Sequence, residues 1–102
     1  MKSYNNVTLI GRATGNPDLT GAIARFELAV DRPRKDAEGK HPTDILQITA
    51  SGKLAEICHD YIQKGCLVLV SGRIQSRPME IVADSVSILE YCKEKTKGGD
   101  EN

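Results

Sequence analysis

The sequence has no tryptophan, a single phenylalanine and no excess of charge, because its fourteen Lys and Arg residues are balanced by fourteen Asp and Glu residues. This balance excludes attraction to polyanions through overall charge, so any electrostatic site must come from local segregation of charges. No apolar run approaches the length of a transmembrane helix. The first apolar run, residues 7–10, is too short and too polar at its flanks for a signal peptide, which predicts a cytoplasmic protein with no membrane partner.

Cysteines are few and irregularly spaced. Cys58, Cys66 and Cys92 form no disulfide framework and are expected to be thiols in a reducing compartment. Cys58, His59 and Cys66 lack a fourth ligand at regular spacing, which argues against a metal site. No combination of Ser, His and Asp has the arrangement of a catalytic centre. We therefore expect no metal, no cofactor and no enzymatic activity.

The 102 residues suffice for one domain and not for two. Alternation of apolar and polar side chains is clearest at residues 22–31, as a half-buried strand requires. The remaining strands are predicted at residues 7–12, 43–50, 66–76 and 79–89. The charged segment 32–42 contains Pro and Gly and predicts a long, mobile loop.

Between the third and fourth strands the apolar period changes to that of a helix. Its buried stripe consists of Leu54, Ile57, Cys58, Tyr61 and Ile62. Ser51 is placed to cap the start of this helix and Gly65 its end, while Gly72 marks a bulge or bend in the fourth strand.

This order of elements predicts an all-β fold, a five-stranded OB-fold barrel with one helix between strands 3 and 4, and a small sandwich is the structural alternative. Residues 1–90 would form the domain. Residues 91–102 have no apolar period and are expected to form a short disordered tail.

Four segments carry a resemblance to a known family. Residues 6–12 (NVTLIGR), 24–30 (ARFELAV), 52–57 (GKLAEI) and 82–86 (VADSV) together resemble the bacterial single-stranded DNA-binding proteins, in that family's order and approximate spacing. The resemblance runs from about residue 5 to residue 90. It implies an OB-fold homo-oligomer, a homotetramer rather than a homodimer, that binds single-stranded DNA by aromatic stacking and a basic groove in replication, recombination or repair.

The sequence departs from the family in three places. Ser51 and Ile45 occupy positions that are commonly aromatic, which thins the stacking platform. The turn at Arg77 and Pro78 replaces a long hairpin between the last two strands. The tail is short and ends in Asn102. It is not the long acidic tail, closed by a hydrophobic residue, through which family members recruit replication and repair proteins, the further candidate partners.

A small set of side chains is predicted to contact nucleic acid. Lys53, at the helix start, is the phosphate contact that the resemblance implies. Loop and strand positions that flank the cleft of OB folds add Arg32, Arg34, Lys35, Arg73 and Arg77. Phe26 and Tyr61 lie on apolar stripes and are expected in the core, which leaves Tyr4 and Tyr91 as rings able to stack. Binding would rest on phosphates more than on bases and would be sensitive to salt.

The first strand is apolar on both faces, although a small barrel buries only its inner face. Val7 and Leu9 are therefore predicted at an interface between copies, with first strands paired across a two-fold axis. The alternative function is a protein-interaction adaptor of the primosomal type with weak DNA binding. Zero net charge, the short hairpin and Ser51 favour that alternative.

Overall fold

A computed structural model describes residues 2–91 as six strands and one helix. In chain order these are β1 (Val7–Ala13), β2 (Asp18–Thr20), β3 (Ile23–Asp31), β4 (Thr43–Ser51), α1 (Lys53–Tyr61), β5 (Leu67–Gln75) and β6 (Glu80–Glu90). The five predicted strands and the helix are confirmed close to their predicted bounds. The short strand β2 is additional, so the strand count is six. The predicted tail lies outside the described residues except for Tyr91, and so does Cys92.

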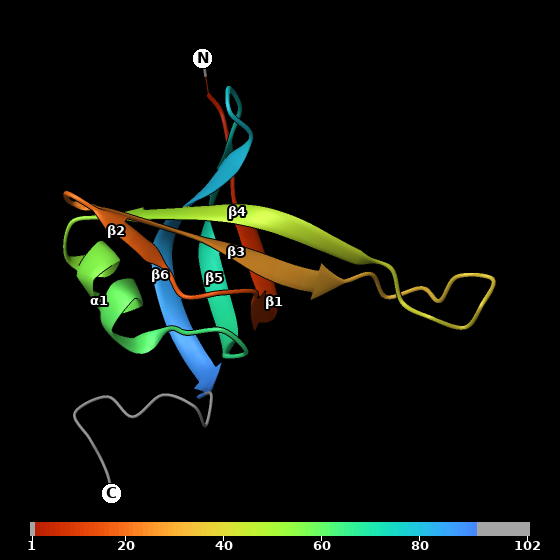
Figure 1. Ribbon diagram of the computed structural model, residues 1–102. Helices are drawn as coiled ribbons and strands as arrows, with labels where there is room; N and C mark the ends of the chain where they lie inside the picture. Colours follow the sequence, from red (N-terminus) through yellow and green to blue (C-terminus); the bar gives the residue numbers. More distant parts are fainter. Residues whose placement is uncertain (1, 92–102) are drawn as a thin grey trace, which may run out of the picture.

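The strands form one sheet that closes on itself. The order is β1-β5-β6-β4-β3-β2, and β1 also pairs with β3 at Arg12 and Ala13. All pairings are antiparallel except the one between β4 and β6. In Figure 1, β3 and β4 extend beyond the barrel and carry the loop 32–42, while α1 lies at the opposite end of these two strands. The closure between β1 and β3 makes the fold a barrel and not a sandwich.

Two glycines permit this closure because no side chain fits at their positions. A Cβ at Gly11 would collide with the carbonyl oxygen of Ala29, where β1 approaches β3. A Cβ at Gly72 would collide with the carbonyl oxygen of Val82 and lie 2.9 Å from Ala83 Cα. The register between β5 and β6 shifts between Ser71 and Gly72, which confirms the bulge predicted there.

The core lies on the inner face of the barrel and under α1. Its largest fully buried side chains are Leu28, Ile48, Ile62, Val68, Val70, Cys58 and Cys66. Both of these cysteines are free thiols, as predicted, and burial raises the pKa of Cys58 to about 11. Phe26 is buried, also as predicted.

Four predictions about the helix are wrong. Ile57, expected on the buried stripe, is 42% exposed. Gly65 does not cap the end of the helix, because the C-cap is Ile62. Ser51 does not cap α1, because it is still paired with Ile23 in the ladder between β3 and β4. The capping residue is Gly52, at φ 65°, and no side chain caps the helix. Tyr61 is 41% exposed and not in the core, because the helix ends there and Ile62 turns into extended backbone well before Gly65.

Within residues 2–91, no helix is long and apolar enough to cross a membrane.

Candidate functional site

The outer surface of β3 and β4 is a polar platform on an apolar barrel. Successive side chains of a strand point to opposite faces, so the residues before and after the buried Phe26 and Ile48 in their strands point outward. We call this surface the β3–β4 outer face; it consists of Arg25, Glu27, Ala29, Ile45, Gln47, Thr49 and Ser51. Directly opposite one another are Arg25 and Thr49, Glu27 and Gln47, and Ala29 and Ile45. Ile45 is 51% exposed and is the most exposed large apolar side chain on this side of the two strands, where Ile23, opposite Ser51, is half-buried.

Two carboxylates organise the polar side chains of this face. Glu27 Oε2 accepts a hydrogen bond of 2.7 Å from Gln47 Nε2, and its Oε1 accepts one of 3.2 Å from Thr14 Oγ1. On the other side of β4, Glu80 Oε1 accepts a bond of 2.5 Å from Thr49 Oγ1.

The network continues onto β5. Glu80 Oε2 accepts a bond of 3.2 Å from Gln75 Nε2, and Arg73 Nη1 donates to Gln75 Oε1 at 3.1 Å. The two carboxylates and their donors therefore form a polar strip that runs from β3 across β4 and β6 to β5.

The loop 32–42 has an ordered tip, held by Asp36. Asp36 Oδ1 accepts hydrogen bonds from the backbone N–H groups of Glu38 and Lys40, both 2.9 Å long. The Asp36 N–H also donates to the Lys40 carbonyl at 2.7 Å. Arg34 and Lys35 are exposed beside this tip.

Arg32, at the base of the loop, is paired with a carboxylate. Its Nε and Nη2 atoms donate to both oxygens of Asp44 at 2.8 to 3.3 Å. The carboxylate raises the pKa of Arg32, and this bonding lowers the pKa of Asp44, so the pair is lost only when pH falls through that lowered value. By strand alternation Asp44 faces the side of β4 away from Ile45. Arg32 is therefore held away from the β3–β4 outer face.

The turn between β5 and β6 gathers exposed side chains at another end of the barrel. Asn5 exchanges two hydrogen bonds with the backbone of Ile74, at 2.7 and 2.9 Å, and so fixes the N-terminal segment beside this hairpin (Figure 1). Tyr4, next to Asn5, is 91% exposed. Arg77 and Met79 are exposed in the turn itself.

The seven predicted contact residues thus form three groups and not one cluster. Lys53 is exposed at the first residue of α1, two positions after Ser51. Arg73, Arg77 and Tyr4 belong to the β5–β6 hairpin end; Arg32, Arg34 and Lys35 belong to the loop 32–42. The strands β3 and β4 connect two of these groups, because the loop 32–42 follows β3 at one end and α1 lies at the other (Figure 1).

Sequence reasoning missed the charged side chains of that face. Arg25 and Glu27 alternate with apolar residues in the most clearly predicted strand. This alternation was enough to predict that both side chains point outward. Glu80 had no such signal, because its contact with Thr49 depends on the parallel pairing of β4 with β6.

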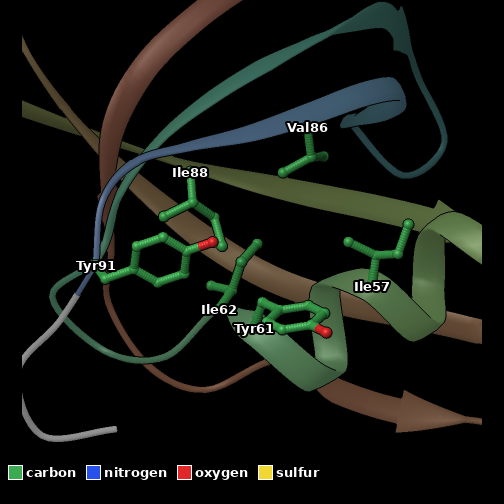
Figure 2. Close-up of a pocket in the computed structure, with 6 residues that line it drawn as sticks. All are labelled: Ile57, Tyr61, Ile62, Val86, Ile88 and Tyr91. Atoms are coloured by element: carbon green, nitrogen blue, oxygen red, sulfur yellow. The ribbon is translucent and has the colours of Figure 1, made fainter. Parts of the chain in front are cut away.

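A separate apolar groove lies between α1 and β6, with a volume of about 300 Å³. Figure 2 shows the six side chains that line it: Ile57, Tyr61, Ile62, Val86, Ile88 and Tyr91. Tyr91 is 66% exposed but belongs to this groove, so it is not placed on the β3–β4 outer face. Among residues 2–91 no group of three or more His, Cys, Asp and Glu side chains could hold a metal ion.

Comparison with known proteins identifies the family. The family model described as the single-strand binding protein family matches residues 4–95. The chain belongs to this family. It is 40% identical to a single-stranded DNA-binding protein of Clostridium tetani, over 92% of this chain and 76% of that protein. It is 45% identical to single-stranded DNA-binding protein B of Bacillus subtilis, over 76% of this chain and 73% of that protein.

A solved structure confirms the fold of this family member. The small single-stranded DNA-binding protein from Streptomyces coelicolor superposes with a TM-score of 0.72, covering 85% of this chain and 95% of that one at 20% identity. The barrel is therefore the OB fold that the order of elements predicted, with β2 added in the first connection.

Proposed function

We propose that this protein binds single-stranded DNA in a sequence-tolerant way, and that it serves replication, recombination or repair. The family match over residues 4–95 carries the proposal. OB folds bind oligonucleotides on the face of their second and third strands and on the loops beside it. In this chain those strands are β3 and β4, so the β3–β4 outer face is the proposed binding surface.

Phosphate contacts are expected to dominate binding. Stacking on aromatic rings contributes about 1–3 kcal/mol per base, and the β3–β4 outer face has no ring. The cations around it can contact phosphates instead: Arg25, Lys53, Arg34, Lys35, Arg73 and Arg77. Tyr4 is the one ring beside the hairpin end that is placed to stack.

Fluorescence anisotropy of a labelled oligo-dT tests the proposal. The logarithm of the affinity should fall linearly with the logarithm of the salt concentration, with a slope of about −0.7 per phosphate contacted. No binding even at low salt would refute the proposal. If the protein binds oligo-dT only weakly and retains a protein partner in pull-down experiments, the primosomal-type adaptor would be favoured.

Replacing Lys53 with alanine should weaken binding to every single strand and reduce the salt slope by about 0.7, the share of one phosphate. Lys64→Ala is the matched control, because Lys64 is an exposed lysine beyond the other end of α1. Its slope should equal that of the wild type. An unchanged slope for Lys53→Ala would remove Lys53 from the site.

The two arginines of the loop should differ in their effect. Arg34→Ala should weaken binding more than Arg32→Ala, because Asp44 already neutralises Arg32 and holds it away from the β3–β4 outer face. The same salt titration measures both. An equal or larger loss for Arg32→Ala would mean that this arginine exchanges Asp44 for a phosphate.

We also propose assembly through β1. In the described part of the chain β1 pairs with β5 through residues 7–12, but with β3 only at Arg12 and Ala13, so one edge of its first half is open. Val7 and Leu9 pack against the core, and Ile10 is 51% exposed on the outer side. If the open β1 edges of two copies pair, Ile10 is covered by the partner copy, and the backbone groups of Val7 and Leu9 form hydrogen bonds between the copies.

Light scattering should give four times the mass of the chain for the proposed homotetramer; a monomer would refute assembly.

The proposed partners are single-stranded DNA, other copies of the chain, and replication or repair proteins. We further propose a cytoplasmic location and no catalytic activity.

A further inference from the structure

Resting on the proposed function, we propose that Asp36 is a positioning residue for single-strand binding. It holds the loop 32–42, which we call the arm, in an ordered shape that presents cations to phosphates. These cations are Arg34, Lys35 and Lys40. Asp36 need not touch the nucleic acid, because it acts through the backbone that carries the three side chains.

Backbone hydrogen bonds close the arm at two levels. At its base the Arg32 N–H donates to the Pro42 carbonyl at 2.7 Å, directly beyond the last pair of the β3–β4 ladder. At its tip the Asp36 N–H donates to the Lys40 carbonyl, also at 2.7 Å. In Figure 1 the arm extends from the ends of β3 and β4, away from the barrel. The shape of the arm therefore depends on its own hydrogen bonds and not on packing against the core.

The side chain of Asp36 contributes as much to the tip as the backbone does. Its Oδ1 accepts hydrogen bonds of 2.9 Å from the N–H groups of Glu38 and Lys40. The other two hydrogen bonds within residues 36–40 join backbone groups alone. Asp and Asn side chains stabilise turns by accepting from backbone groups in this way. Loss of the Asp36 acceptor would leave both N–H groups to water and loosen the tip.

The cations of the arm are free to bind a ligand. Within residues 2–91, Arg34, Lys35 and Lys40 are exposed and form no ion pair. Asp44, at the base, is already paired, and Asp36 Oδ1 faces backbone N–H groups. The closure at the tip places Lys40 on the leg of the arm opposite Lys35. An ordered arm thus offers phosphates cations on both legs, and binding need not first immobilise the loop.

Two effects of Asp36 on binding have opposite signs. Its negative charge repels a polyanion, so removal of the charge alone should strengthen binding. Its hydrogen bonds keep the arm ordered, so their removal adds the cost of ordering the loop to the cost of binding. Asparagine separates the two effects, because it lacks the charge but keeps the Oδ1 acceptor.

Anisotropy of a labelled oligo-dT at low salt tests the proposal. Asp36→Ala should weaken binding about fivefold, although it removes a negative charge. Asp36→Asn should bind at least as tightly as the wild type. Amide hydrogen exchange should show faster exchange at Glu38 and Lys40 in the alanine variant only. The urea midpoint of this variant should match the wild type, because the arm lies outside the barrel.

Glu38→Ala is the matched control. It removes a carboxylate from the same exposed tip, and in the described part of the chain this carboxylate accepts no hydrogen bond. Its binding should be at least as tight as that of the wild type. Lys40→Ala should reduce the salt slope by about 0.7, the share of one phosphate, and an unchanged slope would remove Lys40 from the site.

The possible outcomes separate this role from the proposed function. Failure of the wild type to bind at low salt would refute single-strand binding itself. Wild-type binding together with an Asp36→Ala variant that binds as tightly as Asp36→Asn would overturn the positioning role alone. Equal weakening by both substitutions would also overturn it, because the charge and not the acceptor would then matter.

Discussion

Replacing Gly72 with valine should lower the free energy of unfolding by about 3 kcal/mol, the largest stability loss that we expect from a single substitution in this barrel. The new Cβ would overlap the carbonyl oxygen of Val82 and lie 2.9 Å from Ala83 Cα. These are backbone atoms of the paired strand β6 and cannot rotate away. Relief requires that β5 and β6 separate at the bulge which curls the sheet. Urea unfolding followed by circular dichroism measures the loss.

Gly15→Val supplies the comparison for this substitution. No heavy atom lies within 4 Å of the position that a Cβ would take at Gly15, in the segment before β2. Its free energy of unfolding should stay within about 0.5 kcal/mol of the wild type. Equal stability of the two variants would contradict the close approach of β5 and β6 at Gly72.

Placing an aromatic ring on the β3–β4 outer face should produce the largest gain in affinity. Ile45 is 51% exposed. It lies opposite Ala29, near the start of β4, and its side chain points outward. Ile45→Trp would offer one base a stacking surface worth about 1–3 kcal/mol, which is a five- to 150-fold increase in affinity for single strands. Titration with a labelled oligo-dT at fixed salt measures this gain.

Leu89→Trp is the control for that experiment. Leu89 is exposed to nearly the same extent, 50%, but lies near the end of β6, far along the strand from the residues that pair with β4. It should bind oligo-dT as the wild type does. A gain for Leu89→Trp but none for Ile45→Trp would mean that the nucleic acid runs over another part of the barrel.

Local pattern was enough for most of the fold. The alternation at residues 22–31 gave β3 with its inner and outer faces, and Gly72 marked the bulge. Errors arose at the two ends of the helix. Ser51 has the composition of a helix cap, but its pairing with Ile23 keeps it in β4. Tyr61 falls on the apolar stripe of α1, yet it is the last residue of the helix and remains partly exposed.

The candidate site was less accessible to sequence reasoning. Lys53 and the loop cations could be selected one by one, from the resemblance and from their loop positions. Their partners could not, because Arg32 meets Asp44 only once the β3–β4 register is set. Likewise Thr49 meets Glu80, 31 residues away, through a parallel pairing that no local period encodes.

Mapping of amide chemical shifts on addition of a short single-stranded oligonucleotide tests the central proposal most directly. We expect the largest changes on β3 and β4, at Lys53 and in the turn between β5 and β6, with the α1–β6 groove unaffected. Changes confined to that groove, around Ile57, Tyr61 and Ile88, would contradict the β3–β4 outer face as the nucleic-acid interface.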